Sequence, residues 1–148
     1  MAKSRMIRPE LGESQTFLEM DEWGRLLWLN MISLVDDAGI LPGNFPILSG
    51  NLLSGLKVKN EIIEENLKHL EERKAVYRYE VDGSKYIILL NFFTYQALNN
   101  PSPSKRPLPL QEDYNNCIIQ LQYWYDNYKL KVLDHPRNIN VNVSSKLN

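Results

Sequence analysis

A mostly helical α+β fold is predicted from three features of the sequence. The chain has 148 residues, a length typical of one domain with a core of its own. Hydrophobic residues make up 43% of the chain and charged residues 24%, proportions typical of a globular protein. Apolar residues recur at helical spacing in the first half and then alternate over residues 75–90. We therefore expect helices followed by one short β-hairpin.

Charge and cysteine content exclude several classes of protein. The net charge is -1, with 17 basic and 18 acidic residues, so any contact with nucleic acid depends on local basic patches. Cys117 is alone and only His69 and His135 accompany it, which excludes a disulfide framework and leaves little for a metal site. The basic start lacks the apolar stretch of a signal peptide, and no apolar run approaches the ~18 residues of a membrane span. We expect a cytoplasmic protein without cofactor, metal or membrane partner.

The first strong helix is predicted over residues 21–35. Asp21 can cap its start, because an aspartate side chain accepts hydrogen bonds from the first turn. The sequence Asp-Asp-Ala-Gly at 36–39 ends the helix, and a short extended piece follows at 40–42. The apolar residues at helical spacing, expected in the core, are Trp23, Leu26, Leu27, Met31 and Leu34.

Two further helices are predicted before the hairpin. The weaker one covers residues 45–53, with Asn44 as N-cap and Pro46 in the first turn. The stronger one covers residues 60–74, separated from the first by a short turn. Its buried stripe is expected to consist of Ile63, Leu67 and Leu70.

The hairpin is predicted at Asp82-Gly83, since an Asp-Gly pair between alternating strands favours a two-residue turn. Such a turn pairs Val81 with Ser84, Glu80 with Lys85, and Tyr79 with Tyr86. The face expected to be buried holds Tyr77, Tyr79, Val81, Tyr86, Ile88 and Leu90. The face expected to see solvent holds Arg78, Glu80 and Lys85.

The rest of the chain is divided by a proline-rich linker. Four prolines within residues 99–109 exclude regular structure there, so the domain is expected to cover residues 1–110. A last amphipathic helix is predicted over 111–133, followed by a polar tail at 134–148. The helix could bind a partner, form a homodimer or pack back on the domain. Its apolar side is expected to hold Tyr114, Ile118, Leu121, Trp124, Tyr125 and Tyr128.

The predicted order is helix, short strand, helix, turn, helix and hairpin, which is the order of a winged helix-turn-helix. In that architecture the third helix usually enters the DNA major groove and the hairpin, or wing, contacts the DNA backbone. The same order also serves protein contacts, because a fold does not fix a function.

Several sequence motifs occur in an order that resembles one family. They are RMIRP, GRLLW, DDAGILPGNF, YRYEVDGSKYIILLNF and, after Gln96, NPSPSK. In this order they resemble the N-terminal helix-turn-helix domain of phage replisome organisers and related phage replication initiation proteins, over about residues 3–109. The resemblance implies binding of duplex origin DNA and recruitment of a replicative helicase or its loader inside a bacterial host cell.

The candidate DNA contacts are basic residues outside the helices. Lys57 and Lys59 precede the third helix. There they either bind a phosphate or form a turn that is only solvated. Asn60 can reach a base edge, although capping of the helix is the expected role. Lys85 faces Glu80 across the hairpin, which would leave Arg78 the freer charge. The other candidates, in a basic N-terminal arm or in the linker, are Lys3, Arg5, Arg8, Lys105 and Arg106.

The acidic third helix supports two alternatives to replication. The helix holds five glutamates against three basic residues, a balance that repels phosphate. One alternative is a winged-helix protein-interaction module that adapts or inhibits a host protein. The other is a transcriptional regulator on the same fold, which would require a dimer. The sequence has no phosphate-binding loop and no hydrolase motif, so we expect no catalytic residue and no enzyme activity.

Overall fold

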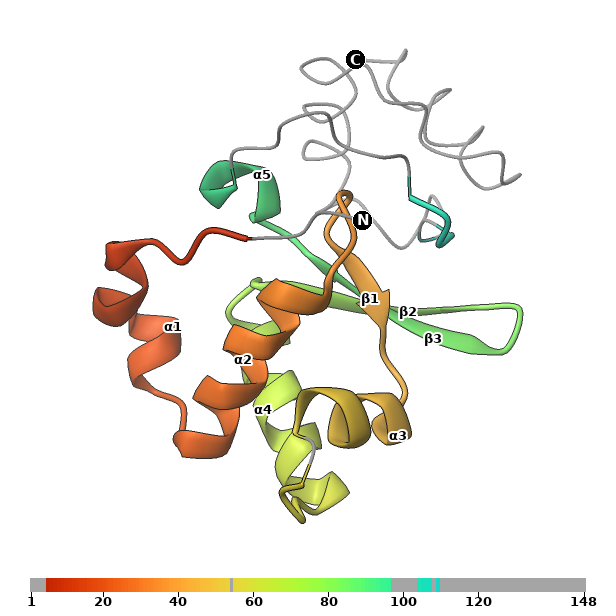
Figure 1. The fold of residues 1–148 in the computed structure, drawn as a ribbon, viewed down its shortest axis with the longest axis horizontal. Coiled ribbons are helices and arrows are strands. Elements are labelled where there is room, and N and C mark those ends of the chain that lie inside the picture. The colour runs from red at the N-terminus through yellow and green to blue at the C-terminus, as the bar shows by residue number, and fades with distance from the viewer. Residues whose placement is uncertain (1–4, 54, 97–103, 108, 110–148) are drawn as a thin grey trace.

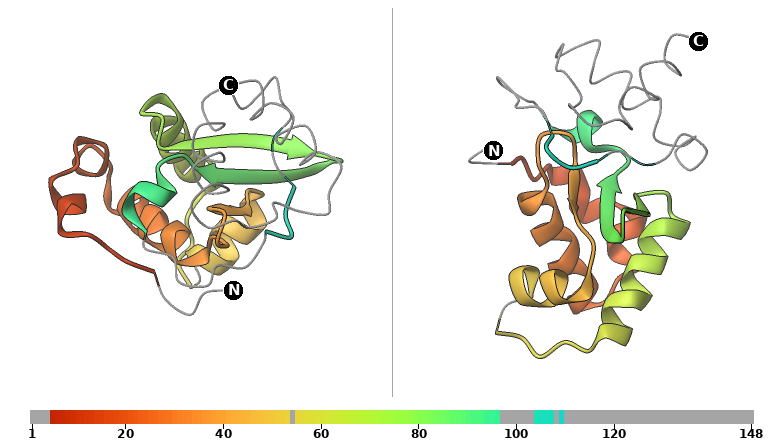
Figure 2. Two further views of the ribbon diagram at one scale, coloured as in Figure 1. Left: turned by 90° about the horizontal axis from the view of Figure 1, so that it is seen from above. Right: turned by 90° about the vertical axis from the view of Figure 1, so that its right-hand side faces the viewer.

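The computed structural model shows an α+β fold with a three-stranded antiparallel sheet (Figure 1). Strands β1 (Ile40–Pro42), β2 (Val76–Val81) and β3 (Ser84–Leu89) lie in the order β1-β3-β2. Helices α2 (Glu22–Leu34) and α4 (Asn60–Glu72) contact each other on one side of the sheet (Figure 2). The structure describes residues 5–53, 55–96, 104–107 and 109.

Helix α2 confirms the prediction for residues 21–35. The Gly24 N–H donates to Asp21 Oδ1 at 2.7 Å, so the aspartate caps the helix as expected. Leu27 and Met31 are buried in the core. Trp23 is an exception, because 38% of its surface is exposed.

Gly24 allows α2 and α4 to approach closely. A Cβ at this position would overlap Asn66, whose amide donates to the Ile62 carbonyl at 3.0 Å. We expect Gly24→Ala to lower the free energy of unfolding by about 1–3 kcal/mol, despite a gain of about 1 kcal/mol in helix propensity. Urea unfolding measures this loss. Gly50→Ala is the control, because nothing lies within 4 Å of a Cβ there; equal losses in both variants would contradict the account.

The predicted helix at 45–53 is divided in two. Helix α3 (Phe45–Ile47) continues as a π-helical turn (Leu48–Leu52). Pro46 lies in the first turn as predicted, but the Asn44 side chain makes no capping hydrogen bond. Leu48 is completely buried, so the segment still contributes to the core.

Helix α4 buries the predicted stripe Ile63, Leu67 and Leu70. The prediction that Asn60 caps this helix is wrong. Lys59 occupies the N-cap position, and Asn60 is the exposed first residue of the helix. The Asn60 amide is therefore free of a capping role.

The hairpin register is confirmed, with Val81 opposite Ser84 at the Asp-Gly turn. Asp82 has φ of 51° and Gly83 of 83°, the positive values that this two-residue turn requires. The assignment of its faces is correct in part. Val81, Ile88 and Leu90 are buried, and Glu80 and Lys85 are exposed, as predicted. The second face is nevertheless buried as well. Val76 and Ile87, on the face predicted to be exposed, are buried against the helices.

The three tyrosines on the other face of the hairpin are half-buried, beside the buried Val81, Ile88 and Leu90. Tyr79 stacks between Tyr77 and Tyr86, with ring centroids 6.1 and 5.7 Å away. The Tyr79 hydroxyl donates to the Pro107 carbonyl at 2.7 Å, so part of the predicted linker covers this face. Residues 87–90 are all buried, which means that both faces are apolar and alternation alone does not distinguish them.

Three short elements complete the described chain: a 3-10 turn (Pro9–Glu13), α1 (Gln15–Leu18) and α5 (Phe92–Tyr95). No helix among the described residues is long and apolar enough to cross a bilayer. The predicted helix at 111–133 and tail at 134–148 lie outside the described residues. So do the partner-binding candidates Tyr114, Ile118, Leu121, Trp124, Tyr125 and Tyr128.

Candidate nucleic-acid interface

The N-terminus of α4 is a basic site at the surface of the described structure. Lys57 and Lys59 are both exposed there. No side chain among the described residues caps the helix. The first-turn N–H groups of a helix have no partner within it and carry a partial positive charge. A phosphate oxygen can accept these hydrogen bonds while the two lysines neutralise its charge. Glu61, in the same first turn, opposes that attraction.

A groove lies between the hairpin and the segment that runs from Pro42 to Ile47, with Glu64 of α4 at its edge. Its volume is about 880 Å³, and it extends from Pro42 past Glu64 of α4 to Lys85 and Tyr86 of β3. Lys85 is exposed and directly opposite Glu80, as predicted. The groove therefore has one exposed lysine on its hairpin side. Its lining includes both acidic residues (Glu64 and Glu80) and basic ones (Arg78, Lys85 and Arg106).

Arg78 is not the freer charge of the hairpin, and this prediction is wrong. Its guanidinium donates two hydrogen bonds to Glu64, both of 2.8 Å, and one to Glu71, also of 2.8 Å. The hydrogen bonds from Arg78 lower the pKa of Glu64, although partial burial opposes the shift. Arg78 lies on the face that packs against α4, so two glutamates of this helix already neutralise it.

Arg5 is not part of a free basic arm. Its Nη2 donates to Asp37 Oδ1 at 2.9 Å and to the Val35 carbonyl at 3.0 Å, and both charged side chains are about 95% buried. The guanidinium also lies 5.2 Å from the centre of the Phe92 ring, within the range of a cation–π interaction. Arg8 Nε donates to the Tyr95 carbonyl at 3.2 Å. Arg5 and Arg8 therefore attach the chain start to the domain, and Lys3 lies outside the described residues.

The linker is attached to the same turn. Asp36 Oδ1 accepts from the N–H groups of Ala38 and Ile40, and Oδ2 accepts from the Ser104 hydroxyl at 2.5 Å. Burial raises the pKa of Asp36, although these hydrogen bonds oppose the shift. Arg106 donates to the Ile40 carbonyl at 2.5 Å and lies 3.8 Å from Asp36, whereas Lys105 is exposed. The Arg106 side chain therefore stabilises the fold through Ile40 and Asp36.

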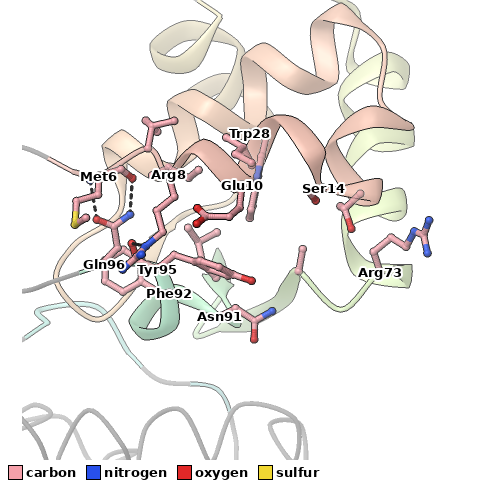
Figure 3. A pocket seen from close by; sticks show the side chains of 16 residues that line it. Met6, Arg8, Glu10, Ser14, Trp28, Arg73, Asn91, Phe92, Tyr95 and Gln96 are labelled. Atoms are coloured by element: carbon pink, nitrogen blue, oxygen red, sulfur yellow. Dashed lines mark hydrogen bonds between the residues drawn. The ribbon is translucent and has the colours of Figure 1, made fainter.

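Gln96 also holds the chain start on the domain. Its side chain exchanges two hydrogen bonds of 2.9 Å with the backbone of Met6 (Figure 3). Sequence reasoning missed Asp36, Asp37, Gln96 and Ser104 as positioning residues. The available signal was their place in the ordered motifs, since Ser104 of NPSPSK contacts Asp36 of DDAG and Gln96 contacts Met6 of RMIRP.

The described residues include no group of three or more His, Cys, Asp or Glu side chains that could hold a metal ion. His69 Nε2 lies 3.0 Å from the Thr16 carbonyl, where it links α4 to α1. The exposed side of α4 is mainly acidic, with Glu61, Glu65 and Glu72 against the single exposed Lys68. The start of the helix can therefore bind an anion.

Comparisons of the chain with protein-family models, with curated proteins and with solved structures found no match.

Proposed function

We propose that this chain is a winged-helix protein of phage or prophage replication initiation that binds duplex origin DNA. The order α2-β1-α3-α4-β2-β3 supports this architecture, since a winged helix places a helix, a turn and a second helix before its hairpin. The observation that carries the proposal is the pair of exposed lysines at the uncapped start of α4. This is the helix that enters the major groove in winged-helix proteins.

The proposed DNA contacts are of two kinds: contacts with phosphates, which position the protein, and contacts with base edges, which read the sequence. Lys57 and Lys59 bind phosphates beside the start of α4, and Lys85 binds the backbone from the hairpin. Asn60 is exposed at the first helical position, where its amide can pair with an adenine edge. The buried or paired Arg5, Arg78 and Arg106 have other roles, so the proposed interface is smaller than the sequence predicts.

The replication role is based on the resemblance to phage replisome organisers. In this role the bound chain would deliver a helicase or its loader to the origin in a bacterial host cell. A contact with such a partner is part of the proposal and depends on surfaces other than the lysines at 57 and 59.

The double variant Lys57→Ala/Lys59→Ala tests the interface. Each lost phosphate contact reduces the slope of log affinity against log salt concentration by about 0.9, so we expect the slope to flatten by about 2. Fluorescence anisotropy with a labelled duplex at several salt concentrations measures it. The matched control is Lys74→Asn at the other end of α4, because asparagine tolerates the positive φ of 57° there.

The control should retain the slope of the unmodified chain, since Lys74 is remote from the start of α4. A double variant with an unchanged slope would remove Lys57 and Lys59 from the interface. Circular dichroism of all three proteins excludes loss of fold as the cause.

A protein-interaction module is the second candidate, and the acidic side of α4 favours it. Glu61, Glu65 and Glu72 are exposed on this helix, where they repel phosphate and attract a basic protein surface. Such a module would retain one abundant partner from host lysate after nuclease treatment, whereas a DNA-binding chain would lose its nucleic-acid-linked partners.

A further inference from the structure

The described part of the linker, residues 104–107 and 109, forms a strap along the sheet (Figure 1). The Pro107 carbonyl accepts a hydrogen bond of 2.7 Å from the Tyr79 hydroxyl of β2. At the opposite edge of the sheet, the Arg106 side chain donates to the Ile40 carbonyl of β1. The strap therefore contacts both edge strands of the sheet.

The strap buries its prolines and leaves its lysine in solvent. Pro107 and Pro109 are buried, Arg106 is half-buried and Lys105 is exposed. The Ser104 hydroxyl accepts from the Arg106 N–H at 3.1 Å, which fixes the bend at Arg106 locally. Proline-rich segments lose little backbone freedom on binding, because each proline fixes its own φ. The strap thus has the chemistry of a proline-rich ligand on its site.

The tyrosine face of the hairpin, which holds Tyr77, Tyr79 and Tyr86, supplies the aromatic side of this contact. Tyr79 stacks between the other two tyrosines, with ring centroids 6.1 and 5.7 Å away. The groove beside the hairpin continues the aromatic surface past the strap, because Arg106 lines it together with Tyr86 and Phe45. Aromatic-lined grooves are the surfaces on which proline-rich segments dock.

We propose that the tyrosine face is a recognition site for proline-rich segments. The strap occupies it within the chain, and a basic proline-rich segment of a partner protein occupies it when the strap is released. The strap defines the chemistry of that partner segment. An arginine lies directly before the first of two prolines, and a hydroxyl side chain lies two residues before the arginine.

The groove favours a partner segment as the second occupant. Its volume is about 880 Å³, and a segment longer than the strap can continue along Phe45 and Pro42. The contacts of the strap involve neither Lys57 nor Lys59, so the proposal does not depend on DNA binding.

Tethering makes the strap an internal competitor for the site. Residues 97–103 connect Gln96 to Ser104, and a short tether gives an effective concentration of about millimolar. A free segment therefore binds weakly to the unmodified chain, and any change that weakens the strap tightens the binding of the free segment. A linker that is only packed as part of the fold would not produce this inverse relation.

A labelled peptide with the sequence of residues 104–109 and blocked ends is the probe, and fluorescence anisotropy measures its affinity for the full chain. Arg106→Ala in the chain removes the donor to Ile40 from the strap but not from the peptide. We expect this variant to bind the peptide at least ~10-fold more tightly than the unmodified chain does. The matched control Lys105→Ala removes an exposed charge and should leave the affinity unchanged.

The same substitutions made in the peptide should act in the opposite direction. Arg106→Ala in the peptide should weaken its binding by at least ~10-fold, because the peptide then lacks the donor to Ile40. Lys105→Ala in the peptide should have little effect. Ser104→Ala in the chain, which removes the donor to Asp36, is a second strap variant that should also tighten binding. Circular dichroism confirms that each variant of the chain is folded.

Three results would overturn the proposal. A peptide that binds neither Arg106→Ala nor Ser104→Ala would make the strap a fixed part of the fold. Equal losses from the arginine and lysine substitutions in the peptide would mean that only its charge is attracted. Strap variants that form dimers instead of binding the peptide, as native mass spectrometry would show, would make the linker of a second copy the occupant.

Discussion

Asp37→Ala is expected to lower the free energy of unfolding by about 3–5 kcal/mol, the typical effect of breaking a buried ion pair. Asp37 and Arg5 are each about 95% buried and 2.9 Å apart. The substitution would leave the Arg5 guanidinium buried without its carboxylate, and it would release the chain start from the core. Urea unfolding of the full chain measures the loss.

Glu65→Ala is the matched control, because Glu65 is an exposed carboxylate whose removal should change stability by about 0.5 kcal/mol or less. If Asp37→Ala were as stable as this control, Arg5 would not be held in the interior. A basic arm available to DNA would then again be the better description of residues 5–8.

Arg78→Ala is expected to lower the free energy of unfolding by about 1–3 kcal/mol. Arg78 connects β2 to α4 through Glu64 and Glu71, and each of the three side chains is between 26% and 35% exposed. The partial exposure keeps the expected loss below that of a fully buried pair. Arg78→Lys should recover little of the loss, because a lysine lacks the bidentate fork that binds Glu64.

The pH dependence of stability separates this ion pair from a general packing defect. Because the hydrogen bonds from Arg78 lower the pKa of Glu64 in the folded state, the pair stabilises the fold above the ordinary value of 4.5. That stabilisation is lost as the pH falls through the lowered folded-state pKa. Urea unfolding at about pH 6 and about pH 3 should therefore show a smaller acid-induced loss in Arg78→Ala than in the unmodified chain. Identical acid losses would contradict the pairing.

Local signals predicted much of the fold correctly. Asp21 determines the start of α2, and the Asp82-Gly83 turn fixes the pairing of β2 with β3. In both cases the interacting residues are within a few positions of one another, so propensity and turn chemistry are sufficient. The same local rules could not distinguish the two hairpin faces, because residues 87–90 are apolar in succession and part of the linker covers the second face.

The candidate site was harder to predict because basic residues look alike in sequence. Arg5 pairs with an aspartate 32 positions away, Arg78 with a glutamate 14 positions away, and Arg106 with a carbonyl 66 positions away. None of these partners follows from charge counting. Lys57 and Lys59 are exposed before α4, and their contact with DNA stays a prediction.

Binding of the unmodified chain to duplex DNA is the decisive measurement for the proposed DNA interface. Fluorescence anisotropy of labelled duplex and single-stranded DNA would be measured over a series of salt concentrations at fixed pH. Three phosphate contacts, from Lys57, Lys59 and Lys85, predict binding to the duplex with a log–log salt slope of about -3. Absence of binding to either form at low salt would contradict the DNA proposal and make the acidic side of α4 a protein-binding surface.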